Sequence, residues 1–368
     1  MSKGIFTRFQ GRRAAQLENR LARVTLLVGG GHIAEITLQQ KGVNALWRPP
    51  WPTIEPAAFD PGIHTAYGNN AESRLLAGIM GHNLCLDIFG PPSEEEARCG
   101  LTVHGEAPVV NWKISSPRGG QLQATAELPV ARLRVNRRLA LVSGQAVLNI
   151  VETVENLASV DRAVGWTQHV TLGPPFLAPG RTLLFASATR SKVIETDFTG
   201  GKGRQLTGAE FDWPWCPARD GGRIDRREMR DAPVSAGYTA HLMDRRKEQA
   251  WFAAYNQDVE VLFGYLWQRS DFPWLGIWEE NRSREQPPWN GRTIALGLEF
   301  GVSPMPESRR GMIDRGSLFG VPTYRWIPAR SQVRVHYSAF IRRAPGLRKT
   351  TVFDPCRWLA SAGKWKAP

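Results

Sequence analysis

ARLRVNRRLALV, residues 131–142, is the stretch that decides the fold class. Apolar residues at Leu133, Val135 and Leu139 alternate with polar ones, which is the pattern of a β-strand with one buried face. The turn sequence LVSGQ (141–145) follows, and the apolar stretch AVLNIVET (146–153) comes directly after it. This order of strand, turn and strand predicts two antiparallel neighbours in a sheet.

The same pattern recurs on both sides of this stretch, and turn sequences such as SPRGG (116–120) and RDGG (219–222) separate the segments. The expected strands are 23–28, 31–38, 122–128, 132–139, 146–153, 250–255, 260–267, 292–300 and 332–341. Only two short helices are expected, 93–98, where Ser93 precedes three glutamates, and 307–315. Strands that follow one another without helices between them predict an all-β fold, a large antiparallel β-sandwich with few short helices.

The length of 368 residues would allow two or three domains at about 150 residues each, but all-β domains are often much larger. Neither an internal repeat nor a low-complexity linker divides the sequence. We therefore expect one β-sandwich domain over 15–343, an N-terminal extension over 1–14, and a basic C-terminal tail over 344–368.

The net charge and the cysteine content limit which partners, metals and cofactors can be expected. Lys and Arg exceed Asp and Glu by 47 to 34, a net charge of +13, but the basic residues are scattered and form no nucleic-acid-binding motif. The four cysteines form no CxxC pair and have no histidine at metal spacing, so we expect free thiols and no metal or cofactor. An apolar run of about 20 residues and a signal-peptide pattern are both missing, so we expect a cytoplasmic protein that binds neither nucleic acid nor membrane.

Three polar residues stand inside apolar or glycine-rich strand contexts. They are His104 in GLTVHGEAPVVNW (100–112), His169 in GWTQHVTLGPPF (165–176) and Glu299 in IALGLEFGVSP (294–304). Two imidazoles and one carboxylate form a plausible acid/base set, with Glu299 as the general base. Taken singly, each is more often a structural residue than a catalytic one.

In their order along the chain, these stretches resemble the aldose 1-epimerase (galactose mutarotase) family. VHGEAPVVNW is similar to the family's Asn-x-Leu-His-Gly-Gly stretch and the Trp that follows it, although Thr102 replaces the Asn. QHVTLGPPF stands in place of Asn-His-x-Tyr-Phe-Asn-Leu and lacks the Tyr-Phe-Asn-Leu run, whereas ALGLEFGVSP is similar to the family's Glu segment. LENRLARVTLLVGGGHIAEI (17–36) resembles the first two strands, and WIPARSQVRVHYSAFIR (326–342) resembles the closing strand.

The resemblance implies a supersandwich of the galactose mutarotase-like type. It also implies that the protein interconverts the anomers of an aldose without a cofactor. Glu299 would take the proton of the anomeric hydroxyl, His169 would protonate the ring oxygen, and His104 would hydrogen-bond the same oxygen. The family's substrate-binding arginine and aspartate would correspond to Arg74 and Asp212.

Further candidate substrate-binding residues come from the sequence around these positions. His82 and Asn83, in MGHNLCLD, lie shortly before His104 and could join the pocket. Trp213 and Trp278 could offer the flat surface on which the apolar face of a sugar stacks, or could simply fill the core.

Other functions are left open by the sequence. We expect the partner to be a monosaccharide or a sugar derivative, and in a hexose-6-phosphate epimerase arginines would clamp the phosphate. A second class is a non-catalytic sugar-binding protein on the same fold. A third is a lyase or hydrolase, in which Glu279 or Glu280 would face Glu299. The oligomeric state is not indicated.

Overall fold

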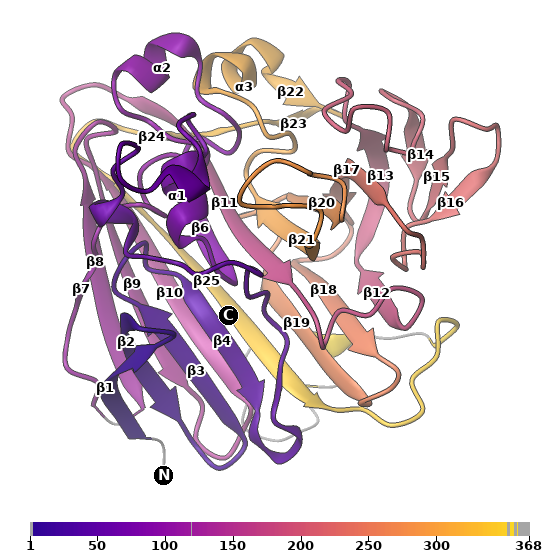
Figure 1. Ribbon diagram of the computed structural model, residues 1–368, viewed down its shortest axis with the longest axis horizontal. Coiled ribbons are helices and arrows are strands. Elements are labelled where there is room, and N and C mark those ends of the chain that lie inside the picture. Colours follow the sequence, from indigo (N-terminus) through magenta and orange to yellow (C-terminus); the bar gives the residue numbers. More distant parts are fainter. Residues whose placement is uncertain (1–2, 119, 352–353, 357–358, 360–368) are drawn as a thin grey trace.

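Two large antiparallel sheets packed face to face form the body of the protein in the computed structural model, which describes residues 3–118, 120–351, 354–356 and 359 (Figure 1). The larger sheet has 13 strands. Its order is β1 (Lys3–Phe9), β2 (Arg12–Glu18), β3 (Ala22–Leu27), β4 (Ile33–Leu38), β6 (His82–Asp87), β11 (Arg162–Leu172), β21 (Ile294–Gly301), β20 (Trp274–Asn281), β17 (Ser235–Met243), β13 (Ala188–Val193) and β14 (Glu210–Asp212), with β5 (Val43–Asn44) beside β4 and β24 (Arg325–Ile327) beside β11.

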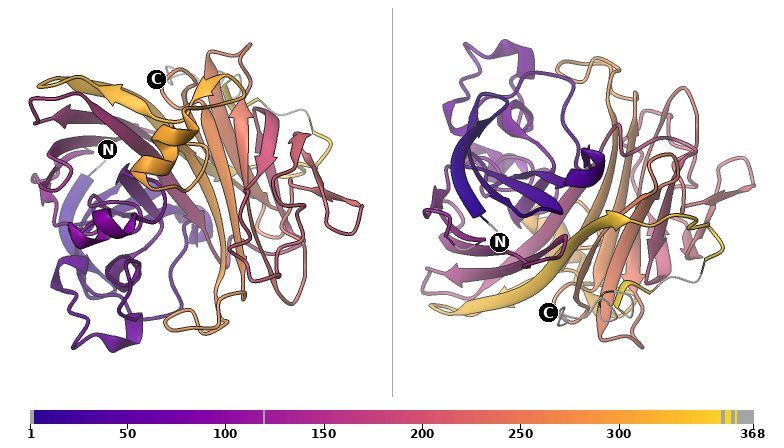
Figure 2. Two further views of the ribbon diagram at one scale, coloured as in Figure 1. Left: turned by 90° about the horizontal axis from the view of Figure 1, so that it is seen from above. Right: turned by 90° about the horizontal axis from the view of Figure 1, so that it is seen from below.

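The smaller sheet has eight strands. Its order is β12 (Thr182–Ala186), β18 (Gln249–Asn256), β19 (Val261–Gln268), β25 (Gln332–Arg343), β10 (Val147–Asn156), β9 (Leu133–Leu141), β8 (Gln121–Leu128) and β7 (Lys113–Ile114). Figure 2 shows β25, in yellow, extending from the side of the N-terminal strands toward the orange strands of the second half.

Short elements complete the described part of the chain. Two small hairpins pair β15 (Trp215–Pro217) with β16 (Arg223–Asp225) and β22 (Ser317–Leu318) with β23 (Val321–Pro322). The helices are α1 (Ser73–Gly78), α2 (Glu94–Arg98) and α3 (Arg309–Arg315), with single 3₁₀ turns at Gln39–Lys41, Pro56–Ala58 and Thr65–Tyr67. Helix α2 begins with the expected cap, because the Ser93 hydroxyl accepts from the Glu96 amide while the Glu96 carboxylate accepts from the Ser93 amide.

The prediction of an all-β sandwich with few short helices is confirmed, and each of the nine expected strands is found within a few residues of its expected bounds. The stretch 131–142 forms β9, which pairs with β8 on one side and with β10 on the other. Leu133, Val135 and Leu139 of β9 are buried between the sheets, as the alternation predicts.

A buried polar network crosses the interface between the two sheets. Arg137 shares the inward face of β9 with the apolar residues, and its Nε lies 2.7 Å from Glu152 Oε2 of β10. Trp166 Nε1 and Gln168 Nε2, both from β11, donate to the other Glu152 oxygen at 2.6 and 2.7 Å. Strand β11 is therefore tied to the smaller sheet by hydrogen bonds as well as by apolar packing.

The ends of the expected domain need correction. The boundary expected at residue 15 falls inside β2, and residues 3–14 belong to the larger sheet, because β1 pairs with β2 and β2 with β3. In the tail, Leu347 packs against the cluster that contains Trp251 and Tyr255. Residues 352–353, 357–358 and 360–368 of the tail lie outside the described residues.

All four cysteines are free thiols, as expected. Among the helices that the structure describes, none combines the length and the apolar character needed to cross a membrane.

Candidate active site

The floor of the candidate site is formed by two neighbouring strands of the larger sheet. His169 of β11 and Glu299 of β21 are directly paired in the antiparallel register, and His169 Nε2 lies 2.8 Å from Glu299 Oε1. Their chain neighbours Val170 and Phe300 belong to the core between the sheets. Because successive side chains of a strand point to opposite faces, His169 and Glu299 lie on the outer face.

Neighbouring groups fix this pair in place. His169 Nδ1 lies 3.0 Å from the Thr171 hydroxyl, so both ring nitrogens have partners. Gly297 precedes Glu299 on the same face, and a Cβ there would stand only 2.3 Å from Glu299 Oε1. A glycine at this position leaves the space that the carboxylate occupies.

His104 reaches the same place from the loop between α2 and β7. Its backbone is left-handed at φ +68°, and its amide and carbonyl are hydrogen-bonded to Gly90 and Leu86. Gly105 is also left-handed, and a Cβ there would lie 2.2 Å from the Leu86 carbonyl oxygen. The His104 ring centroid lies 4.8 Å from that of His169. The loop therefore holds a second imidazole beside the His169–Glu299 pair.

The protonation of His104 follows from its contacts. Its Nδ1 lies 2.5 Å from the Phe89 carbonyl oxygen, which can only accept, so Nδ1 carries the hydrogen. Burial and the neighbouring His169 lower the pKa of His104 below its ordinary value, which favours the neutral ring. The Nε2 atom of a neutral ring with a hydrogen on Nδ1 has a free lone pair and can only accept.

These three residues line a cavity of about 350 Å³ on the outer face of the larger sheet. Its walls are largely apolar and aromatic, and Trp278 of β20 has its ring centroid 6.0 Å from that of His169. Trp47 and Trp289, stacked at 6.3 Å, stand in the wall beside it, and α1 contributes Leu75 and Leu76. The cavity thus joins a polar floor to wide apolar sides.

Arg284 supplies the positive charge of the cavity wall. Its guanidinium lies 4.6 Å from the Trp289 ring centroid and 5.7 Å from that of Trp278, and Nη1 donates to Glu72 Oε1 at 2.8 Å. The Glu280 carboxylate accepts from the Arg284 amide and from the Ser283 amide and hydroxyl. The loop that follows β20 is thereby held against the cavity.

The structure brings together four of the residues singled out in the sequence, His104, His169, Glu299 and Trp278. Asn83 lies beside them, because it pairs in register with His169, and its buried Nδ2 has no hydrogen-bond partner among the described residues. It is not part of the cavity lining.

The other expected substrate-binding residues lie elsewhere, and these expectations are corrected. Arg74 is exposed on α1, because the helix turns Leu75 and Leu76 toward the cavity instead. His82 faces the core between the sheets, where its ring nitrogens contact Tyr265 and Gln168 at 2.9 Å.

Asp212 and Trp213 also lie away from the cavity. Asp212 is exposed on the edge strand β14. Trp213 packs edge-on against His241, with ring centroids 5.0 Å apart.

Sequence reasoning missed Arg284, Glu72, Trp47 and Trp289 as cavity residues. A signal was present for two of them, because Arg284 and Trp289 fall within the polar and aromatic segment EENRSREQPPWN (279–290). Within the described residues, no group of His, Cys, Asp and Glu side chains has the arrangement of a metal site.

Comparison with known proteins identifies the fold. Neither a protein-family model nor a curated protein matches the sequence. The chain is similar to the solved structure of a candidate aldose 1-epimerase from Klebsiella pneumoniae, with a TM-score of 0.64 and 13% identity, over 91% of this chain and 80% of that one. It is also similar to a galactose mutarotase-like protein from Clostridium acetobutylicum, with a TM-score of 0.61 and 13% identity, over 92% of this chain and 98% of that one.

A third similar structure is a galactose mutarotase related enzyme from Lactobacillus acidophilus, with a TM-score of 0.57 and 10% identity, over 90% of this chain and 98% of that one. The chain therefore has the galactose mutarotase-like fold, and the expected supersandwich is confirmed. At identities this low, the likeness establishes the fold, and function must be argued from the site.

Proposed function

We propose that the protein interconverts the anomers of an aldose by acid/base opening and closure of the sugar ring. The observation that carries this proposal is the His169–Glu299 pair, 2.8 Å apart on the floor of an aromatic cavity with His104 beside it. The anomeric hydroxyl and the ring oxygen of an aldose are bonded to the same carbon. One acid and one base held side by side can therefore serve both oxygens.

The proton transfers balance within this pair. Glu299 takes the proton of the anomeric hydroxyl while His169 Nε2 gives its proton to the ring oxygen. The bond from C1 to the ring oxygen breaks, and C1 becomes an aldehyde carbon. After rotation about the C1–C2 bond, the reverse transfers close the ring with the hydroxyl on the other face. The pair ends as it began, and each transfer of this kind contributes about 10²- to 10⁴-fold to the rate.

We propose a role for His104 that differs from the one implied by the family resemblance. Because its Nδ1 hydrogen is engaged by the Phe89 carbonyl, its Nε2 can accept a hydrogen bond but cannot donate one to the ring oxygen. We assign it to a sugar hydroxyl, which would donate to Nε2 and so orient the ring over His169 and Glu299. His104 would bind and position the sugar while the other two residues move protons.

The cavity lining favours an uncharged sugar over a phosphorylated one. Among the residues that the structure describes, Arg284 is the only arginine or lysine in this lining, and Glu72, which accepts a hydrogen bond from Arg284, is a carboxylate of the same lining. A phosphate clamp would need several cationic donors free of such partners. The tryptophan walls suit the apolar face of a pyranose.

Hydrolysis receives no support from the carboxylates first considered for it. Glu279 is paired with Arg226 at 2.9 Å, and the Glu280 carboxylate is occupied by Ser283 and Arg284. Neither lines the cavity with Glu299.

Anomer interconversion of freshly dissolved α-glucose, α-galactose and a panel of other aldoses, followed by polarimetry or NMR, tests the proposal. Glu299→Gln keeps the shape of the side chain and removes the base, so we expect the catalysed rate to fall by about 10²- to 10⁴-fold. Glu35→Gln is the matched control, because Glu35 is another buried glutamate on a strand of the same sheet. Its carboxylate accepts hydrogen bonds from the hydroxyls of Thr25 and Thr37.

Two results would overturn the mechanism. The first is a wild-type protein that accelerates none of the aldoses, and the second is a Glu299→Gln variant as fast as the wild type. Sugar-dependent tryptophan fluorescence without any acceleration would identify a binding protein instead.

A further inference from the structure

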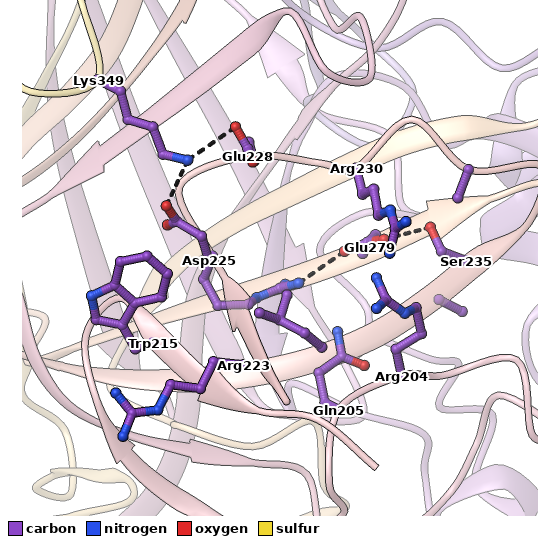
Figure 3. A pocket seen from close by; sticks show the side chains of 14 residues that line it. Arg204, Gln205, Trp215, Arg223, Asp225, Glu228, Arg230, Ser235, Glu279 and Lys349 are labelled. Atoms are coloured by element: carbon purple, nitrogen blue, oxygen red, sulfur yellow. Dashed lines mark hydrogen bonds and ion pairs between the residues drawn. The ribbon is translucent and has the colours of Figure 1, made fainter. Parts of the chain in front are cut away.

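A second cavity has a volume of about 400 Å³, and Figure 3 shows the side chains that line it. It lies on the other side of the larger sheet from the candidate active site. Glu279 of β20 lines it, whereas its chain neighbour Trp278 lines the first cavity, and adjacent residues of a strand face opposite sides. The other walls come from Ser235 of β17, the β15–β16 hairpin and the segment that follows it, the segment around Arg204, and Lys349.

A buried arginine with unused donors stands in this cavity. Arg226 is only 2% exposed, and its Nη1 donates to Glu279 Oε2 at 2.9 Å. The other Glu279 oxygen accepts from the Ser235 hydroxyl. Arg226 Nε and Nη2 have no hydrogen-bond partner among the described residues. These two atoms form one edge of the guanidinium, the edge that binds two oxygens of an oxyanion side by side.

The charges facing the cavity leave a positive excess. Its lining holds five basic side chains and three carboxylates. Glu279 is matched by Arg226, whereas Lys349 lies 2.6 Å from Asp225 and 3.1 Å from Glu228.

The three remaining cations are Arg204, Arg223 and Arg230, and within the described part of the chain none of them forms an ion pair with a carboxylate. Figure 3 shows Arg204 and Arg230 on the Glu279 side and Arg223 beside Trp215. A ligand with two negative charges and several acceptor oxygens matches this arrangement better than a single carboxylate does.

An exposed aromatic residue extends the cavity beyond a simple anion site. Trp215 is 48% exposed, and the Arg227 guanidinium lies 5.5 Å from its ring centroid. We propose that this cavity binds a phosphate monoester, with the phosphate at Arg204, Arg226 and Arg230 and the organic group against Trp215. This second site is independent of the acid/base chemistry proposed for the first cavity.

Calorimetric titration of the full chain with phenyl phosphate and with inorganic phosphate tests the proposal. The double variant R204Q/R230Q removes two free cations that are not buried, so its fold is expected to persist, which circular dichroism checks. R226K keeps the charge beside Glu279 but removes the unused edge. We expect each variant to weaken phenyl phosphate binding at least about tenfold. R20Q is the matched control, because Arg20 is an exposed turn residue outside the cavity.

Further titrations distinguish an ester site from a free phosphate site and from non-specific attraction by the net charge. We expect phenyl phosphate to bind more tightly than inorganic phosphate and W215A to remove that difference. Equal affinities for phenyl phosphate and inorganic phosphate would show that the cavity binds free phosphate, and would overturn the proposal of a phosphate monoester. Absence of saturable binding, or equal loss in R20Q and R204Q/R230Q, would overturn the site itself, because attraction by the net charge of +13 would then explain the signal. E299Q is expected to leave binding unchanged, and a loss in that variant would place phenyl phosphate in the first cavity.

Discussion

Replacing Arg137 by methionine tests the polar network beneath the candidate site. Arg137 and Glu152 are both fully buried, with Nε and Oε2 2.7 Å apart. Arg137 Nη1 also donates to the Gly31 carbonyl at 3.0 Å. Arg137→Met removes the cation but leaves the Glu152 carboxylate in the core, where its remaining hydrogen-bond donors among the described residues are Trp166, Gln168 and Tyr337.

The expected loss of unfolding free energy is about 3–5 kcal/mol, because one partner of a buried ion pair is left uncompensated. Most of that cost comes from the remaining charge, so the double variant Arg137→Met/Glu152→Gln should be at least about 1 kcal/mol more stable than Arg137→Met alone. Arg134→Met is the control from the same strand. Arg134 is partly exposed and pairs with Glu127 and Glu155 at the surface, so its loss should cost about 0–1 kcal/mol.

Reversible unfolding in urea at neutral pH, followed by tryptophan fluorescence and near-UV circular dichroism, measures all three variants. An Arg137→Met variant within 1 kcal/mol of the wild type would refute the reasoning. So would a double variant Arg137→Met/Glu152→Gln that is no more stable than Arg137→Met alone.

Two further predictions concern acid stability and sugar affinity. Burial lowers the pKa of His32, His82, His104 and His241. The unfolded chain therefore binds protons below about pH 6.5 that the native chain does not, and each histidine should remove up to about 1.4 kcal/mol of stability per pH unit as the pH falls. Urea unfolding at neutral and mildly acidic pH checks this, and an unchanged midpoint would contradict it. Arg284→Met should raise KM for the sugar about tenfold with little change in kcat, because Arg284 stands in the wall and not at the proposed reacting atoms. Steady-state kinetics measure both constants, and a fall confined to kcat would contradict the assignment.

Alternation of apolar and polar residues marked the strands with one partly solvated face. In β8 and β9 buried and more exposed residues alternate, and the sequence marks both. In β17 all nine residues are buried, and β11 is buried along nearly its whole length, because loops and α1 cover the outer face of the larger sheet. Alternation disappears where both faces are covered, so the sequence does not delimit these strands, although they line the candidate site.

Within the site, the sequence was more informative about the floor than about the walls. His104, His169 and Glu299 stood out because polar residues are rare in apolar strand contexts, and the structure brings them together. Arg74 and Arg284 cannot be told apart in this way. The choice between them depends on which face α1 turns to the cavity and on where the loop after β20 folds, and both are set by contacts far apart in the sequence.

The register that pairs His169 with Glu299 has a consequence for how this protein can change. The spacing of these two side chains is set by the hydrogen-bond ladder between β11 and β21, whereas much of the surrounding wall comes from α1 and from loops. An altered or exchanged loop would reshape the chamber without shifting the two groups relative to each other. Under the proposed function, new substrate preferences could therefore arise one loop at a time while the acid/base pair keeps its geometry.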